Sequence, residues 1–195
     1  MDSWIHTFTG RKFDPLHPDP GQVVIEDIAH ALALKCRFTG HTRTFYSVAE
    51  HSVRVAALLG FWGHNPQTQL QGLLHDASEA YLPDISATIK HLVSISGTAF
   101  AVQEDWIVAE VLTGLGLDDI GHPKTSHEVK AADVVLCVTE ARDLLHGVSE
   151  WSWKTPDPLP EPITAWAWQE AETGFVRAYY RLRGEMGMGV GEKEG

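Results

Sequence analysis

The chain has 195 residues, of which 44% are hydrophobic and 21% are charged, and its formal net charge is −11. This composition is typical of one folded soluble domain with at most a small extension, and it excludes an intrinsically disordered chain. The acidic balance also argues against a partner that is a nucleic acid polymer, because binding to its phosphate backbone needs a basic face.

Two cysteines, Cys36 and Cys137, are too few for a disulfide framework, and neither belongs to a Cys-x-x-Cys pair. The N-terminus lacks the apolar segment of a signal peptide, and no stretch approaches the roughly 20 apolar residues of a membrane span. We therefore expect a cytoplasmic protein without a membrane partner.

Residues 1–23 are rich in proline, aspartate and aromatic residues, and the prolines exclude a regular helix. We expect this segment to be irregular, apart from a short hairpin in "IHTFTGRKFD" with Thr9-Gly10 as its turn. Helical periodicity from Val24 onwards predicts a domain over residues 24–185. The Gly-rich polar end, residues 186–195, is expected to be a disordered tail.

The apolar periodicity after Val24 predicts a first helix, with Gly40 as its C-terminal stop. Ser47 and Glu50 match a capping box, in which a serine caps the helix and a glutamate follows three residues later. This motif predicts a second helix that begins at Ser47 and ends at Gly60.

Asn65-Pro66 predicts the next helix start, because it places an N-cap residue before a proline at the first helical position. We expect this helix to continue to Tyr81, where Leu82-Pro83 breaks it. Residues 86–95 form at best a short amphipathic helix, whereas the apolar face of residues 98–117 predicts a longer one.

Thr125 and Glu128 match a second capping box, which opens a helix with Asp133 near its middle. Residues 148–162 contain four prolines and predict a loop, after which Pro162 starts the last helix. About six or more helices with little strand predict an all-α fold, a single helical bundle.

Four polar side chains stand out in the predicted helices: His51, His75, Asp76 and Asp133. The helical pattern predicts either that they are buried or, for His75 and Asp76, that they border the same edge of one helix. Asp133 lies between alanines and valines, where an unpaired carboxylate would cost a large free energy. One divalent cation would satisfy all four groups, because imidazole nitrogens and carboxylate oxygens bind a zinc-like ion at roughly 2.0–2.2 Å. The alternative is a structural polar network without an ion.

Three stretches, "EHS" at 50–52, "LLHDASE" at 73–79 and "AAD" at 131–133, resemble the H…HD…D signature of the HD superfamily of metal-dependent phosphohydrolases. The resemblance covers roughly residues 24 to 145. The longer run "HDASEAYLPDISATIK" is similar to the branch that contains bacterial 5′-deoxynucleotidases and phage nucleotide phosphohydrolases. It implies a single HD domain and an enzyme.

The resemblance also implies roles for individual residues. His51, His75, Asp76 and Asp133 would hold a divalent ion (Co, Mn, Zn, Fe, Ni or Mg), which polarises a phosphate oxygen and activates the attacking water. Glu79 would position or deprotonate that water, or bind a second ion. Asp84 would accept a hydrogen bond from a sugar hydroxyl or protonate the leaving oxygen.

Arg37 and Phe38 correspond to an arginine–aromatic pair that contacts phosphate and nucleoside in the relatives, although those commonly carry tryptophan where this chain has Phe38. Lys90 is a second candidate for phosphate binding, because it matches a lysine of the same branch. Arg43 is expected to line the opening of the same substrate site.

The expected activity is removal of the 5′-phosphate from (deoxy)nucleoside monophosphates. A triphosphohydrolase of deoxynucleoside triphosphates would use the same site with more cations along the polyphosphate. A catalytically silent nucleotide or metal sensor is the alternative of another class, and a helical scaffold is a third. Trp166, Phe175 and Tyr179 in the last helical segment would either cap the core or support a homodimer or higher oligomer.

Overall fold

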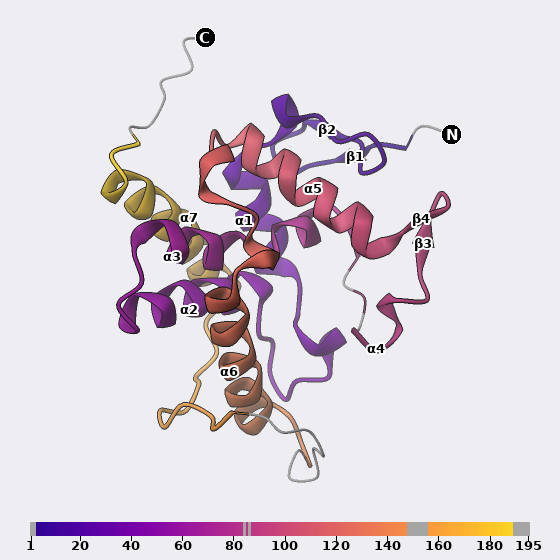
Figure 1. Cartoon of the computed structure of the whole chain (residues 1–195). Helices are drawn as coiled ribbons and strands as arrows, with labels where there is room; N and C mark the ends of the chain where they lie inside the picture. The colour runs from indigo at the N-terminus through magenta and orange to yellow at the C-terminus, as the bar shows by residue number, and fades with distance from the viewer. Residues whose placement is uncertain (1–2, 84, 86, 148–155, 189–195) are drawn as a thin grey trace.

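Figure 1 shows the computed structural model of the chain, which describes residues 3–83, 85, 87–147 and 156–188. Within these ranges the chain forms seven α-helices and two short hairpins, which confirms the prediction of an all-α helical bundle. The helices are α1 (Ile25–Leu34), α2 (Val48–Phe61), α3 (Pro66–Leu74), α4 (Ala87–Lys90), α5 (Phe100–Gly114), α6 (His127–Leu144) and α7 (Trp168–Glu185). The strands are β1 (Ile5–His6), β2 (Lys12–Phe13), β3 (Ser94–Ile95) and β4 (Thr98–Ala99). Short 3-10 helices are η1 (Pro20–Gln22), η2 (Phe38–Gly40), η3 (Ala77–Ala80), η4 (Asp118–Ile120) and η5 (Pro123–Thr125).

Helices α2, α3 and α7 pack against one another, with α1 against α2 and α7, and α6 against α2 and α3 (Figure 1). The main core extends from Phe13 in the N-terminal hairpin to Leu182 in α7, so the two ends of the described chain share one core. A smaller apolar cluster lies between α2 and α6 and contains Val55, Leu58, Leu59, Val129, Ala132 and Leu136. Burial of this cluster fixes α6 beside α2, because separating them would expose its apolar surface to water.

Two predicted helix starts are confirmed. The Ser47 hydroxyl accepts a hydrogen bond from the Glu50 N–H at 3.0 Å, and the Asn65 side chain accepts one from the Thr68 N–H at 2.9 Å. The Glu50 carboxylate accepts from the Trp166 N–H at 2.9 Å. Glu50 therefore ties α2 to the segment that precedes α7.

The predicted end of the first helix is wrong, because α1 ends at Leu34 and not near Gly40. Lys35 is extended, and the chain pairs there with the segment before α2 through a hydrogen bond from the Arg37 N–H to the Tyr46 carbonyl at 2.9 Å. Backbone pairing with a distant segment thus overrides the local helical pattern. It also places Arg37 next to α2.

The second capping box is displaced by one residue. Ser126, and not Thr125, caps α6, because its hydroxyl accepts from the Val129 N–H at 3.2 Å. Thr125 instead ends η5.

The last helix starts at Trp168, not at Pro162. The Trp166 N–H, which would bond within a helix that began at Pro162, donates instead to the Glu50 carboxylate at 2.9 Å. Phe175 and Tyr179 are buried, so they cap the core and are not free for an interface.

The N-terminal hairpin is confirmed, with Ile5 opposite Phe13. In residues 86–95 only Ala87–Lys90 is helical, and the β3–β4 hairpin follows. Residues 148–155 of the predicted loop and 189–195 of the predicted tail lie outside the described residues. No helix in the described ranges is both long and apolar enough for a membrane crossing.

The close approach of α2 and α3 depends on Gly72. A Cβ at this position would lie 2.5 Å from Leu59 Cδ1 and 3.1 Å from Val55 Cγ1, and both side chains are buried. We expect Gly72→Ala to lower the free energy of unfolding by about 1–3 kcal/mol, as overpacked cores do.

Urea denaturation measures this difference. The matched control is Gly184→Ala in α7, where a Cβ meets no atom within 4 Å. It should leave stability unchanged or raise it by about 0.5–1 kcal/mol, since alanine is the better helix former. Equal effects of the two substitutions would contradict the packing explanation.

Candidate metal centre

Three elements bring the four predicted ligands together. His51 lies in the first turns of α2, His75 and Asp76 follow α3, and Asp133 lies in α6. The Nε2 atoms of His51 and His75 are 3.3 Å apart, His75 Nε2 is 3.2 Å from Asp76 Oδ2, and His51 Nε2 is 3.1 Å from Asp133 Oδ1.

These separations fit the ligands of one ion. Bonds of about 2.0–2.2 Å in tetrahedral or octahedral geometry place neighbouring ligand atoms roughly 3.0–3.4 Å apart. The three measured distances all fall close to that range, and one ligand atom from each of His51, His75 and Asp76 lies within 4.8 Å of the others. The donor set of two imidazoles and one carboxylate in this group could hold a divalent transition metal, and Asp133 adjoins it through His51.

The second ring nitrogen of each histidine has an acceptor of its own. His51 Nδ1 lies 2.6 Å from Glu140 Oε1, and His75 Nδ1 lies 2.8 Å from the Gly72 carbonyl oxygen. Since both partners accept, each Nδ1 carries a proton, and in the neutral imidazole that binds a metal the Nε2 lone pair is directed into the cluster. Histidines that bind metals are oriented in this way.

The helix that precedes His75 ends earlier than predicted. α3 stops at Leu74, Asp76 has φ −102° and ψ 16°, and the chain continues as η3, so the expectation of a helix to Tyr81 is wrong. In an α-helix the side chains of two consecutive residues point about 100° apart. Asp76 has irregular backbone angles instead, and its carboxylate lies 3.2 Å from His75 Nε2.

Glu79 lies in η3 and not on a continuation of α3. Its backbone carbonyl accepts a hydrogen bond from Lys35 Nζ at the end of α1, and the Leu82 carbonyl accepts from the same Nζ. Lys35 therefore anchors the segment that follows Asp76.

Glu140 is a fully buried carboxylate that the sequence analysis missed. Besides His51, it accepts hydrogen bonds from the Tyr46 hydroxyl at 2.9 Å and from Arg37 Nε at 3.0 Å. Burial opposes its ionisation, but Arg37 and His51 outweigh burial and lower the pKa of Glu140. Glu140 is seven residues after Asp133, which places both side chains on the same face of the helix two turns apart. This spacing is the sequence signal that could have identified Glu140 as a neighbour of the cluster.

Charge pairing dominates the protonation of the cluster. Burial disfavours the protonated form of His75, but the Asp76 carboxylate outweighs it and raises the pKa of His75 to about 9. Burial also opposes ionisation of Asp76, yet the neighbouring His75 lowers the pKa of that carboxyl. For Asp133, a hydrogen bond with His51 likewise overcomes burial and lowers the pKa.

Asp133 is more accessible than expected, because 37% of its side chain is exposed. It borders a pocket of about 230 Å³ that His75 and Asp76 also line. Lys130, one turn before Asp133, and Lys124 line the same pocket. The open side of the cluster thus faces a cavity that carries two cationic side chains.

Of the predicted substrate contacts, Arg37 lies at the site, with Nη1 3.6 Å from Asp76 Oδ2. Phe38 has φ +53°, and its ring centroid is 5.5 Å from the Arg37 guanidinium carbon. Lys90 Nζ donates a hydrogen bond to Glu104 Oε1 at 2.9 Å, so Lys90 is not a freely solvated lysine. Asp84 lies outside the described residues.

Arg43 is held at the C-terminal end of α6, and its place at the opening of the site stays a prediction. Its guanidinium donates to the Asp143 carbonyl at 2.6 Å, and its backbone N–H donates to the Leu144 carbonyl. Asp143 is ten residues beyond Asp133, which corresponds to about 15 Å of helix.

The raised pKa of His75 predicts opposite pH dependences for the metal-free and metal-loaded protein. Because the folded value of about 9 exceeds the ordinary 6.5, this stabilising contribution is complete below pH 6.5 and is lost as the pH rises toward 9. A metal ion needs the neutral imidazole, so its affinity should increase over the same interval.

Differential scanning calorimetry at pH 6.5 and about pH 8.5, with and without Mn²⁺, checks both trends. We expect the metal-free protein to melt at a lower temperature at the higher pH, and the increase caused by Mn²⁺ to be larger there. An Mn²⁺ effect that is larger at pH 6.5 would contradict this charge arrangement.

Glu140→Gln should weaken metal binding, because it removes the charge that orients His51 while keeping the side-chain shape. We expect about 10–100-fold lower affinity for Mn²⁺ by isothermal titration calorimetry, as for other residues that orient metal ligands. Tyr46→Phe is the control: it removes one hydrogen bond to Glu140 and no charge, so its effect should be smaller. Unchanged affinity in Glu140→Gln would show that Glu140 is only structural.

No protein-family model matches the chain. The uncharacterized protein YfdR of Escherichia coli K12 is 38% identical over 162 residues, which are 81% of this chain and 81% of the relative. An uncharacterized protein of Rhodobacter capsulatus is 35% identical over 167 residues, which are 83% of this chain and 82% of that protein. Identity at this level over most of both chains shows common descent, and the chain belongs to the YfdR family.

Proposed function

We propose that the chain is an HD-superfamily metal-dependent phosphohydrolase that removes the 5′-phosphate of (deoxy)nucleoside monophosphates. The observation that carries the proposal is the set of three ligand-to-ligand distances of 3.1–3.3 Å beside a pocket that Lys124 and Lys130 line together with Asp76 and Asp133. The resemblance of the histidine and aspartate motifs to the nucleotidase branch supports the choice of substrate.

In this mechanism His51, His75, Asp76 and Asp133 would hold one divalent ion. When bound, that ion would act as a Lewis acid toward a phosphate oxygen and would lower the pKa of a water molecule. Lys130 attracts the phosphate dianion into the pocket, and Arg37 compensates the charge of Asp76 and Glu140 around the ligands. Glu79 is the proposed residue for positioning the attacking water.

The distribution of cations favours a monophosphate over a triphosphate. Arg37 is paired with Glu140, Lys90 with Glu104, and Arg43 lies at the far end of α6. Lys124 is 3.5 Å from Glu104. Within the described ranges, Lys130 is the one lysine of the pocket for which no carboxylate partner is seen. A triphosphate would bring more negative charge than this pocket compensates.

The test of the proposal is product release from a panel of deoxynucleoside and nucleoside monophosphates and deoxynucleoside triphosphates. Each is assayed with Co²⁺, Mn²⁺ or Mg²⁺ and with EDTA, in the wild type and in Asp76→Ala. We expect orthophosphate from monophosphates, lost in EDTA and in the variant. Triphosphate release from deoxynucleoside triphosphates would assign the alternative substrate. A folded, metal-binding protein without turnover would be a sensor and would refute the enzyme.

Lys130→Ala should lower kcat/KM for monophosphates by about 10–100-fold, mainly through KM, because a charge-assisted contact to phosphate is lost. Steady-state kinetics at saturating metal measure this change. Lys12→Ala in the N-terminal hairpin is the charge-matched control and should leave both constants unchanged. Equal kinetics of the two variants would remove Lys130 from the phosphate site.

A further inference from the structure

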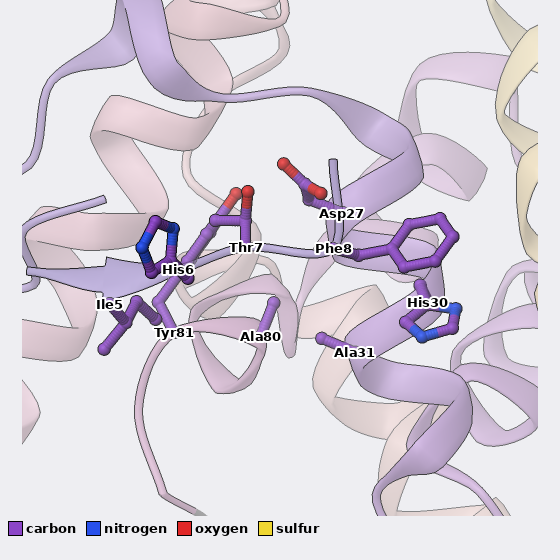
Figure 2. Close-up of a pocket in the computed structure, with 9 residues that line it drawn as sticks. All are labelled: Ile5, His6, Thr7, Phe8, Asp27, His30, Ala31, Ala80 and Tyr81. Atoms are coloured by element: carbon purple, nitrogen blue, oxygen red, sulfur yellow. The ribbon is translucent and has the colours of Figure 1, made fainter. Parts of the chain in front are cut away.

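Two pockets of about 230 Å³ differ in the charged groups that they offer to a ligand. In the pocket between the N-terminal hairpin, α1 and η3, the carboxylate of Asp27 is 2% exposed and accepts from Thr9 through both oxygens (Figure 2). The pocket beside the metal centre is lined by Lys124 and Lys130. Because lysines attract anions over a distance, this second pocket can select a ligand by its charge.

Lys124 is held by two carboxylates of α5. Its Nζ lies 3.5 Å from Glu104 Oε2 and 3.4 Å from Asp105 Oδ1. The two carboxylates differ in burial, because the side chain of Asp105 is 57% exposed and that of Glu104 is 5% exposed. Water and salt screen the pair with Asp105 more than the pair with Glu104. Glu104 is therefore the stronger competitor with an anion in the pocket for the charge of Lys124.

Lys90 holds Glu104 in place. Its Nζ donates to Glu104 Oε1 at 2.9 Å, so each carboxylate oxygen of Glu104 faces one lysine. The same Nζ lies 5.7 Å from the ring centroid of Phe100, a buried residue at the start of α5. Burial opposes the protonated form of Lys90, but the hydrogen bond with Glu104 outweighs it and raises the pKa of Lys90. Glu104 is thus fixed between two cationic side chains.

The charges in this group of side chains balance. Lys90 and Lys124 carry two positive charges, and Glu104 and Asp105 carry two negative ones. A neutral residue at position 104 would leave one uncompensated positive charge beside the pocket. A chain of several phosphates carries more negative charge than orthophosphate, so it would gain more affinity from that change.

We propose that Glu104 is a specificity-determining residue of the metal pocket, which holds Lys124 and so restricts the pocket to ligands with a single phosphate group. Glu104 acts through Lys124 and is a positioning residue. The inference rests on the proposed function and explains its preference for monophosphates. If the group instead only ties α4 and η5 to α5, it contributes to stability and not to selectivity.

Isothermal titration calorimetry of the full-length protein in excess Mg²⁺ tests the proposal, with orthophosphate and inorganic tripolyphosphate as the two ligands. We expect Glu104→Gln to raise the ratio of tripolyphosphate affinity to orthophosphate affinity by about tenfold, as for one added charge near the ligand. Glu104→Met is a second neutral variant and should give the same rise. Glu104→Asp keeps the charge and should keep the wild-type ratio.

Two further variants trace the effect to Lys124. Adding Lys124→Gln to Glu104→Gln should remove the rise in the ratio. Asp105→Asn removes one exposed charge and should raise the ratio by less than about threefold. An unchanged ratio in both neutral variants, with or without a lower melting temperature, would overturn the proposal. An equal rise in Asp105→Asn, or a wild type that does not bind orthophosphate, would also overturn it.

The calorimetric test does not depend on turnover. The expected ratios in a protein that releases no product would support the role of Glu104 and refute only the proposed phosphohydrolase. Turnover of monophosphates with an unchanged ratio in the neutral variants would retain the enzyme and overturn the role of Glu104.

Discussion

The hydrogen bond between His51 Nδ1 and the buried Glu140 carboxylate is the interaction on which the metal centre depends, because it fixes the proton on Nδ1 and frees Nε2 for the cluster. A carboxylate at this depth is tolerable only with compensation. Arg37 and Tyr46 provide it, and both are positioned by the backbone pairing that ends α1 early. The boundary of one helix therefore contributes to the charge state of a residue in another.

The second constraint is the conformation of the chain after α3. Gly72 lets α3 approach α2 closely and offers its carbonyl oxygen to His75, so one residue serves both packing and orientation. Lys35 donates to the carbonyl oxygens of Glu79 in η3 and of Leu82 just after it, and so holds this segment in place. The same short segment continues to Tyr81, whose ring stacks on Phe13 of the N-terminal hairpin. Packing near the N-terminus and ligand geometry at the cluster are thus supported by one stretch of chain.

Sequence patterns could predict the features that local chemistry decides. Ser47 and Asn65 cap helices because side chain and backbone lie within one turn, and His51, His75, Asp76 and Asp133 converge because their motifs sit on packed elements. Residue identity alone could not distinguish Glu140 from a solvated helix carboxylate. The early end of α3, the pairing of Lys90 with Glu104 and the position of Arg43 at the C-terminal end of α6 result from tertiary contacts that no local pattern encodes.

The measurement that tests the metal centre most directly is anomalous diffraction from crystals of the protein grown with Mn²⁺, with data collected on both sides of the manganese absorption edge. One strong peak bonded to His51 Nε2, His75 Nε2, Asp76 and Asp133 at about 2.0–2.2 Å is the predicted result. An ordered cluster without a peak, in crystals that contain the ion at saturating concentration, would contradict the metal centre and leave a structural ion-pair network in its place.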